Sequence, residues 1–287
     1  MSQTAAIKKY PVFMLCGRDA TRRKMMVELD PEGKYKSKAL LPFLGQRLIE
    51  WQLDALAQSP YVENIYLLGL SEEDITLKHP ATFIPVNSTA NVSEKFVQGL
   101  SFLEARGEKP EIIVISSCDA PGVKTEQVNR FMEGLVEHPG ADFVIGLVPE
   151  AVMEAAFPGS GRVVARFRDH QVIAGELYAL SPHMIRMQEA LIGNLNQTRR
   201  KINRQKKRIG LGPMLKLISR KPRSWGLLAK YGLGLATLAD GERALGAAFD
   251  IQINSVIIPE AGFGMDMDLP GDYERLEAFI RKTQSQN

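Results

Sequence analysis

Residues 111–121 of this 287-residue chain read EIIVISSCDAP. An apolar run of this length, followed at once by an Asp-Ala-Pro turn sequence, predicts a strand that is buried on both faces of a sheet. Residues 10–16, YPVFMLC, have the same character and run into a polar loop that begins at Gly17. Parallel sheets bind ligands beyond the carboxyl ends of their strands. The loops after Cys16 and Ser117 are therefore the expected place for a functional site.

Predicted strands and helices alternate along the rest of the chain. Further strands are expected at residues 64–70, 82–86, 141–148, 171–180 and 251–258, and helices at residues 47–58, 91–106, 125–137, 182–191 and 270–282. This order predicts an α/β fold with a doubly wound, mostly parallel sheet that has helices on both faces. Residues 17–38 are polar and are expected to form a long functional loop.

The composition is that of an ordinary soluble globular protein, with 45% hydrophobic and 24% charged residues. The two cysteines form neither a disulfide framework nor a zinc-binding spacing, which predicts a reducing, cytoplasmic location. The first residues are too polar for a signal peptide, and no window contains the roughly 18 uninterrupted apolar residues that a membrane span needs.

The loop after the first predicted strand has residues suited to binding phosphate. Residues 15–22 read LCGRDATR. Backbone amides of such a loop can face phosphate oxygens, and the planar guanidinium of Arg22 can clamp them. Lys38, further along, begins the segment KALLPFLGQRLI. An ordinary solvated loop and a surface lysine before an apolar helix are the alternatives.

Acidic residues stand at two places where a divalent cation could be held. Asp119 follows the strand at the predicted edge of the sheet, and residues 266–272 read DMDLPGD before the last helix. Carboxylate oxygens are the ligands that Mg²⁺ prefers. Asp266 and Asp268 are the two candidates in the second place, and the sequence does not choose between them. A turn at Asp119 and helix capping at Asp268 are the alternatives.

Taken in order, these motifs resemble those of the nucleotidyltransferases of the GT-A-like fold. That group includes sugar-1-phosphate nucleotidyltransferases and molybdenum-cofactor guanylyl- and cytidylyltransferases. LCGRDATR resembles L-A-G-G-x-G-T-R, with Arg18 and Ala20 in place of glycines, and residues 38–49, KALLPFLGQRLI, resemble K-x-L-x-P-x-x-G-x-P-L-I. Asp119-Ala120-Pro121 resembles the D-x-P element, and DMDLPGD resembles D-x-D-T-P-E-D.

The resemblance implies a magnesium-dependent enzyme that transfers a nucleoside monophosphate from a nucleoside triphosphate to a phosphorylated acceptor, such as a sugar 1-phosphate, and releases pyrophosphate. It implies catalytic roles for Arg22, Lys38 and Asp119, and Mg²⁺ held by Asp119 together with Asp266 or Asp268. Residues expected to contact the nucleotide are Leu15, Cys16, Gly17, Arg18, Asn91 and Ser93. For Asn91 and Ser93, capping of the following helix is an equal alternative.

The same resemblance implies an acceptor site in the second half of the chain. Gly175 and Glu176 match a G-N segment that faces the acceptor, with glutamate in place of asparagine. Arg162 could bind an acceptor phosphate, or could belong to an exposed strand face. We expect a single domain over residues 1–287, with a nucleotide-binding half at 11–150 and an acceptor half at 151–287.

Positive charge is concentrated in one segment of the acceptor half. The stretch between Glu189 and Asp240 has 12 lysines and arginines and no acidic residue. Residues 196–235 are expected to form a basic helical insertion. Residues 199–230 could bind an anionic membrane surface, which would make the protein peripheral to the membrane, or a lipid-linked acceptor. A homodimer contact and a solvated helical face are alternatives, and nucleic acid is not expected.

Two other function classes remain open at this point. A GT-A-like glycosyltransferase would bind a ready-made nucleotide sugar through a D-x-D element, and residues 266–268 have that form near the C-terminus. A non-catalytic nucleotide-binding protein associated with a membrane surface would explain Arg18 and Ala20 in the glycine loop. Release of pyrophosphate separates nucleotidyl transfer from both.

Overall fold

The computed structural model describes residues 7–17, 24–187, 219, 222 and 225–285. Its strands are β1 (Tyr10–Leu15), β2 (Pro42–Phe43), β3 (Gln46–Arg47), β4 (Val62–Leu68), β5 (Thr82–Ile84), β6 (Ile113–Ser117), β7 (Phe143–Pro149), β8 (Val164–Arg166), β9 (Gln171–Leu180) and β10 (Ile253–Ile257). Its helices are α1 (Lys24–Leu29), α2 (Leu48–Ala57), α3 (Val92–Ala105), α4 (Thr125–Glu137), α5 (Glu150–Ala156), α8 (Trp225–Gly232), α9 (Leu238–Phe249) and α10 (Asp272–Gln284). Two 3-10 turns are η1 (Lys38–Leu40) and η3 (Ala261–Gly264).

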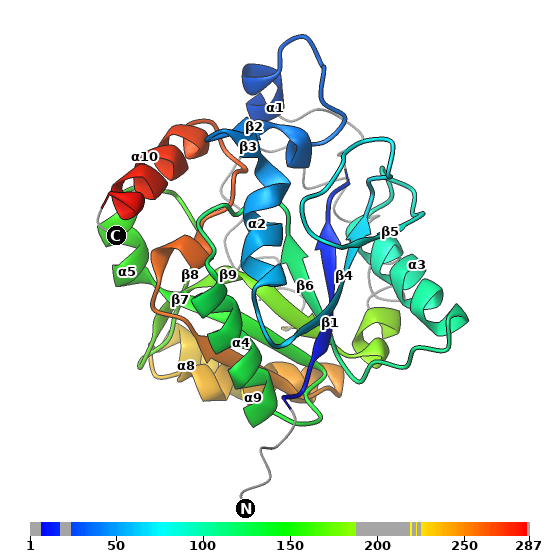
Figure 1. The fold of residues 1–287 in the computed structure, drawn as a ribbon. Coiled ribbons are helices and arrows are strands. Elements are labelled where there is room, and N and C mark those ends of the chain that lie inside the picture. The colour runs from blue at the N-terminus through cyan, green and yellow to red at the C-terminus, as the bar shows by residue number, and fades with distance from the viewer. Residues whose placement is uncertain (1–6, 18–23, 188–218, 220–221, 223–224, 286–287) are drawn as a thin grey trace, which may run out of the picture.

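One mixed, mostly parallel sheet organises the fold (Figure 1). Its strand order is β10-β7-β9-β6-β1-β4-β5, and β8 pairs with β9. β4, β1 and β6 are parallel neighbours, as are β7 and β10, whereas β9 runs antiparallel to both β6 and β7. The predicted doubly wound α/β fold is therefore confirmed, with β9 as a reversed strand inserted near the middle.

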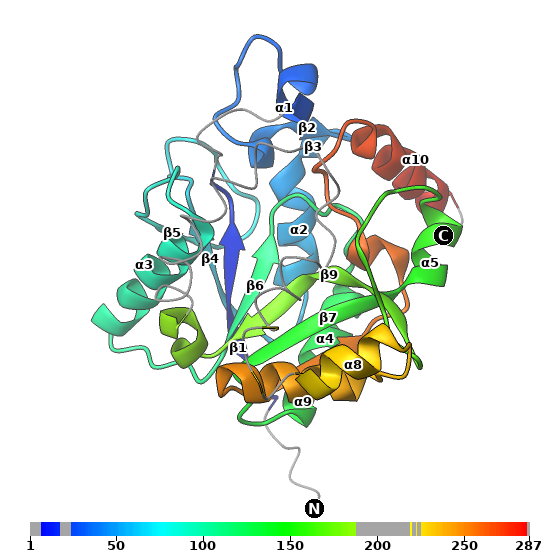
Figure 2. The same ribbon diagram turned by 180° about the vertical axis from the view of Figure 1, so that it is seen from behind.

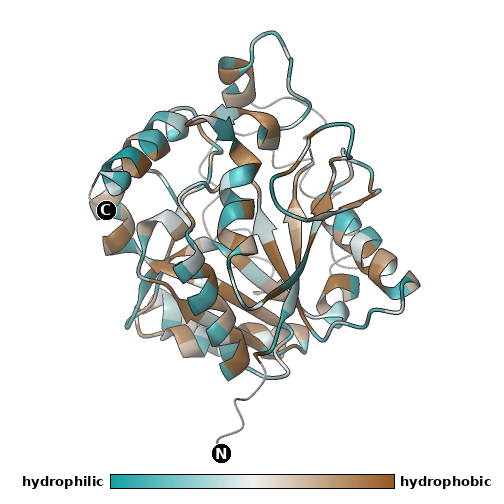
Figure 3. Ribbon diagram, in the orientation of Figure 1, coloured by the Kyte–Doolittle hydropathy of each residue, from teal (hydrophilic) through white to brown (hydrophobic). Residues whose placement is uncertain are grey.

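Both faces of the sheet are covered, because residues of β1 alternate between two apolar layers. Val12 and Met14 pack with residues of α2 and α4, whereas Phe13 packs with Phe96 and Leu100 of α3. Figure 2 shows α8 and α9 lying across the face opposite to α2 and α4. In Figure 3 the central strands are mostly hydrophobic, while the helices alternate between hydrophobic and hydrophilic residues. This pattern is the one expected of strands buried on both faces.

The reversed strand extends beyond the end of β6. Ser116, near the carboxyl end of β6, pairs with Leu177 of β9. The pairing of β9 with β7 continues past this point and reaches Val172, which lies opposite Pro149. The first half of β9 therefore projects past β6, at the edge of the sheet where the candidate site lies.

Several elements differ from the sequence-based expectation. Residues 17–38 were expected to be a loop, but they contain α1; α5 and α9 were not expected at all. The last helix begins at Asp272, two residues later than expected, because Gly271 has a left-handed conformation with φ of 85° and ends the preceding turn. The helix expected at 182–191 is present at 182–187, and its remaining residues lie outside the described part.

A tight hairpin joins η1 to α2. β2 and β3 pair antiparallel through a turn at Leu44 and Gly45, both with positive φ (46° and 85°). This combination is typical of a two-residue hairpin turn, which requires φ above zero at both central positions. The glycine of the KALLPFLGQRLI motif is thus explained by backbone geometry, and the hairpin fixes the distance from Lys38 to the start of α2.

The glycine at position 175 has a packing role that can be tested. A Cβ at Gly175 would overlap the buried ring of Phe263 in η3. Replacing Gly175 with alanine should lower the free energy of unfolding by about 1–3 kcal/mol, because the overpacked ring has to move. Urea unfolding measures this change.

Gly226 of α8 provides the matched control for Gly175. No atom lies within 4 Å of a Cβ built at Gly226. Gly226→Ala should therefore raise the free energy of unfolding by up to about 1 kcal/mol, the difference in helix propensity. Equal effects of the two substitutions would show that Phe263 does not constrain position 175.

Candidate active site

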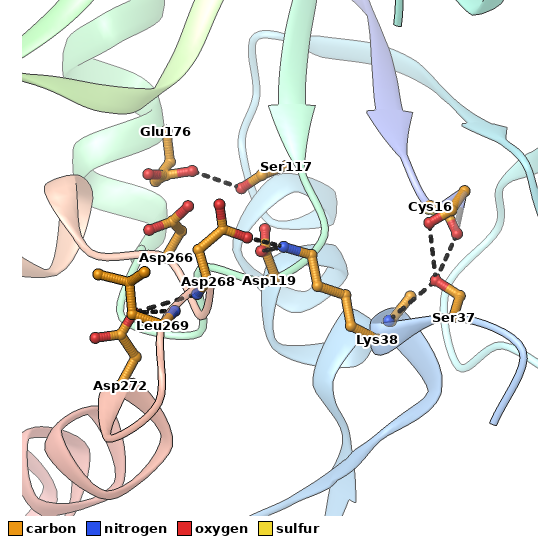
Figure 4. A network of polar contacts seen from close by, with 12 residues as sticks. Cys16, Ser37, Lys38, Ser117, Asp119, Glu176, Asp266, Asp268, Leu269 and Asp272 are labelled. Carbon is orange, nitrogen blue, oxygen red and sulfur yellow. Dashed lines mark hydrogen bonds and ion pairs between the residues drawn. The ribbon is translucent and has the colours of Figure 1, made fainter. Parts of the chain in front are cut away.

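The candidate site lies at the carboxyl ends of β1 and β6 (Figure 4). Leu15 pairs with Ser117 in the parallel register of these strands. The next residues of both strands, Cys16 and Cys118, are buried, and Asp119 follows with only 3% of its surface exposed. The loops after the two strands therefore leave the sheet side by side, as the sequence predicted.

Lys38 reaches the site because Ser37 ties its turn to the end of β1. The Ser37 hydroxyl donates to the carbonyl oxygen of Cys16 at 2.7 Å, with the carbonyl of Gly17 at 3.2 Å. The hydroxyl oxygen of Ser37 also accepts a hydrogen bond from the amide of Ala39 and thereby caps η1. Sequence reasoning missed Ser37, although a serine directly before a helical turn is a recognised capping signal.

Three carboxylates form a cluster, and two of them contact the ammonium group of Lys38. Oxygens of Asp119, Asp266 and Asp268 all lie within 4.8 Å of one another. Lys38 forms an ion pair with Asp119, and its Nζ atom lies 2.5 Å from Oδ1 of Asp268. Asp266 and Asp268 both belong to this cluster, so the geometry does not select one of them as the second metal ligand.

Burial and mutual repulsion govern the charges in the cluster. Burial raises the pKa of Asp266 to about 6, and the negative charge of Asp119 adds to this, while Arg162 opposes it. For Lys38, burial acts to lower the pKa, but the charges of Asp119 and Asp268 outweigh it and raise the pKa above the ordinary lysine value. Lys38 is therefore a permanent cation in this acidic environment.

Arg162 and Asp272 hold the acidic turn in place. The guanidinium of Arg162 lies 2.5 Å from the carboxylate of Asp266 and 3.1 Å from that of Asp272, which is fully buried. The Asp272 carboxylate in turn accepts hydrogen bonds from the backbone amides of Asp268, at 3.2 Å, and Leu269, at 2.8 Å. As expected, Asp272 lies in the first turn of the last helix. Arg162, expected at an acceptor phosphate, is engaged here with two carboxylates.

Glu176 is a fourth acidic side chain near the cluster. Its carboxylate accepts a hydrogen bond from the Ser117 hydroxyl at 2.8 Å (Figure 4). Burial raises the pKa of Glu176 well above its ordinary value, and the charges of Asp266 and Asp119 raise it further. An ionised Glu176 is therefore unfavourable in the folded protein when no metal ion is bound to the cluster.

Replacing Glu176 with glutamine should raise the melting temperature of the metal-free protein at pH 8. Because the folded-state pKa is raised, the stability that Glu176 contributes is complete below the unfolded-state pKa of about 4.5 and is lost as the pH rises through the folded-state pKa. The advantage of Glu176→Gln should therefore be smallest near pH 4.5 and grow toward pH 8. Thermal unfolding across this range measures it, and a constant difference would contradict the assignment.

The residues predicted to contact the nucleotide differ in their structural roles. Asn91 caps α3, since its side chain accepts from the amide of Glu94 and the Glu94 side chain accepts from the amide of Asn91. The capping alternative is thus confirmed for Asn91. Ser93 is buried in the first turn of α3, and Leu15 is partly buried at the end of β1. Arg18 and Arg22 lie outside the described residues.

Comparison with protein families decides which group the chain belongs to. The model for the MobA-like NTP transferase domain matches residues 22–206, which is more than half of the chain. This chain is a member of the MobA-like NTP transferase domain family. The predicted resemblance to nucleotidyltransferases is confirmed, and the activity of this NTP transferase is nucleotidyl transfer.

Solved structures support the fold of the MobA-like NTP transferase. A hypothetical transferase from Thermus thermophilus has a TM-score of 0.67 and 23% identity, over 92% of this chain and 99% of that one. CMP:2-keto-3-deoxy-manno-octonic acid synthetase, complexed with CTP, has a TM-score of 0.55 and 13% identity, over 96% and 99%. 4-Diphosphocytidyl-2C-methyl-D-erythritol synthase from Anaerococcus prevotii has a TM-score of 0.51 and 12% identity, over 96% and 99%.

Two further observations concern the NTP transferase. A search of curated proteins found no match. Within the described ranges, none of the helices combines the length and the apolar character that crossing a bilayer requires.

Proposed function

We propose that this NTP transferase moves a nucleoside monophosphate from a nucleoside triphosphate to a phosphorylated acceptor, such as a sugar 1-phosphate, and releases pyrophosphate. The observation that supports the proposal most directly is the contact of Lys38 with Asp119 and Asp268, in a carboxylate cluster that also contains Asp266, beside the end of β1. A cation and a set of carboxylates at this edge of the sheet suit a metal-bound polyphosphate.

Mg²⁺ would be held by Asp119, Asp266 and Asp268. The donor set fits this ion, because all three ligands are carboxylates and their oxygens lie within 4.8 Å of one another. The ammonium of Lys38 already lies against Asp119 and Asp268, so positive charge is stable there. When bound, the ion would supply positive charge to the phosphate oxygens.

The residues of the chain itself would act by positioning and by balancing charge. Lys38 can stabilise negative charge that develops on the phosphates during transfer, and Arg22 is proposed for the same role. Nucleotide contacts are proposed for Leu15, Cys16, Gly17, Arg18 and Ser93. The buried thiol of Cys16 leaves only its backbone for such a contact. The acceptor supplies the nucleophile, so the chain needs no nucleophilic side chain.

The acceptor would bind on the β9 side of the cluster. Glu176 of β9 lies near the carboxylate cluster: it accepts a hydrogen bond from Ser117, two residues before Asp119, and the charges of Asp266 and Asp119 act on it. Gly175 is accounted for by packing, and Arg162 is paired with carboxylates, so Glu176 is the strongest of the three proposed acceptor residues.

Pyrophosphate release tests the proposal. The protein is first screened by thermal shift with the four common triphosphates, with and without Mg²⁺, because a ligand that binds the folded state raises the melting temperature. The triphosphate that binds is then incubated with a panel of phosphorylated sugars and polyols. We expect pyrophosphate only when both Mg²⁺ and an acceptor are present. Triphosphate binding without release across the panel, or glycosyl transfer from a nucleotide sugar, would contradict the proposal.

Association with an anionic membrane and homodimer formation stay predictions. Residues 199–208, which carry seven of the basic side chains, lie outside the described part of the chain. Sedimentation with vesicles rich in acidic phospholipid, at low salt, tests the first of these; a protein that remains in the supernatant excludes it.

A further inference from the structure

A second lysine approaches the loop after β1 from the side opposite to Lys38. Lys95 belongs to the second turn of α3, and only 5% of its surface is exposed. A Cβ built on Gly17 would overlap the ammonium nitrogen of Lys95 and would lie 2.7 Å from the carbonyl oxygen of Ser88. Position 17 is therefore restricted to glycine by the backbone carbonyl oxygen of Ser88, and the Lys95 ammonium also lies in the space next to it.

The beginning of α3 adds to the positive character of this place. α3 has 14 residues, and its first turn carries the positive end of the helix dipole. The hydroxyl of Ser93, in that turn, is 3% exposed and has no hydrogen-bond partner among the described residues. The helix cap is already made by Asn91 and Glu94, so Ser93 is not needed for it. A buried hydroxyl without a partner indicates a place for a polar ligand atom.

The charge of Lys95 acts at the end of β1. Burial and the neighbouring Cys118 raise the pKa of the Cys16 thiol, and Lys95 acts in the opposite direction. Lys38 reaches the same strand end from η1, held by Ser37 on the carbonyl groups of Cys16 and Gly17. One ammonium group from each face of the sheet thus approaches the end of β1: that of Lys95, which is buried, and that of Lys38, which is partly exposed.

We propose that Lys95 and the first turn of α3, with the Ser93 hydroxyl, form a second anion-binding arm that holds the phosphate chain of the nucleotide. This inference rests on the proposed function, since it concerns the same loop. A compact ammonium group and a helix N-terminus are both suited to phosphate oxygens. Lys38 then acts on the carboxylate side of the loop, and Lys95 holds the nucleotide from the α3 side.

The experiment measures binding and does not depend on turnover. Calorimetry compares the affinities of wild type, Lys95→Met and Ser93→Ala for inorganic pyrophosphate, for the triphosphate found in the screen, and for the matching nucleoside. Lys95→Met should weaken binding of pyrophosphate and triphosphate by about tenfold or more, and leave nucleoside binding within about twofold of wild type. Ser93→Ala should weaken the same two ligands by a smaller factor.

Lys109→Met is the control, because Lys109 lies in the exposed turn before β6, at the other end of that strand. It should bind all three ligands like wild type. Ser93→Ala removes a hydroxyl that has no partner within the described structure, so this variant should fold. It therefore tests the inference even if Lys95→Met does not fold. Unchanged pyrophosphate binding in both variants, or an equal loss of nucleoside binding, would overturn the inference. A wild-type protein that binds triphosphate but releases no pyrophosphate would instead refute the proposed function alone.

Discussion

Replacing Asp119 with alanine should reduce magnesium-dependent pyrophosphate release by about two to three orders of magnitude, the usual cost of removing a group that stabilises transition-state charge. Asp119 is the most buried member of the carboxylate cluster and the one that follows β6 directly. Its removal leaves Lys38 paired with Asp268, so the fold should persist. Initial rates of pyrophosphate release at increasing Mg²⁺ concentration measure the effect.

The matched control is Asp250→Asn. Asp250 ends α9 in a left-handed conformation with φ of 57°, which asparagine also tolerates. This variant loses one carboxylate outside the cluster and should retain wild-type activity. If Asp119→Ala kept full magnesium-dependent release, the proposed role of the cluster would be wrong, whatever the control showed.

Replacing Arg162 with methionine should lower the free energy of unfolding by about 3–5 kcal/mol, the cost of leaving a buried charge without its partner. Asp272 is fully buried, and the Arg162 side chain is 14% exposed, so water cannot replace the lost guanidinium. The freed turn that carries Asp266 and Asp268 should also bind Mg²⁺ more weakly. Chemical denaturation and metal titration measure the two effects.

A double-mutant cycle separates the ion pair from other losses. Asp272→Asn in the Arg162→Met background should cost less than Asp272→Asn in wild type, because the carboxylate it removes has already lost its closer arginine and keeps only Arg275 at 3.5 Å. Arg130→Met is the control, since Arg130 forms a comparable ion pair with Glu260 but is 46% exposed. Exposed pairs contribute about 0–1 kcal/mol. Similar losses for Arg130→Met and Arg162→Met would show that burial does not set the strength of the Arg162 pair.

The elements that sequence reasoning found share a clear local signal. The helix predicted at 125–137 has the bounds of α4, the strand predicted at 171–180 has the bounds of β9, and each other predicted strand has a counterpart whose bounds differ by a few residues. α1 and α5 have only six and seven residues, too short for a helical period to be visible. α9 was missed although Thr237 and Asp240 form a capping box at its start, a signal that the sequence does contain.

The reversal of β9 has a different origin, and the sequence does not contain it. The direction of a strand depends on which strands pair with it, and β9 pairs with two strands that precede it by more than 20 residues. An apolar strand sequence is compatible with either direction. The class of fold was therefore predictable, whereas the position of Glu176 beside Ser117 was not.

The candidate site was predictable where a motif follows a strand. Lys38, Asp119, Asp266 and Asp268 do gather at one edge of the sheet, as their order along the chain suggested. The supporting residues were not predictable. The partners Arg162 and Asp272 are 110 positions apart, and Ser37 and Cys16 are 21 apart, so only the folded chain brings them together.

Because β9 extends beyond the carboxyl end of β6, the strands do not end at the same level at this edge of the sheet. The carboxylate cluster lies beside this projecting part of β9, and Glu176 stands on β9 where the strand passes the last residue of β6. Under the proposed function, Glu176 and the projecting part of β9 would border the acceptor beside the carboxylate cluster.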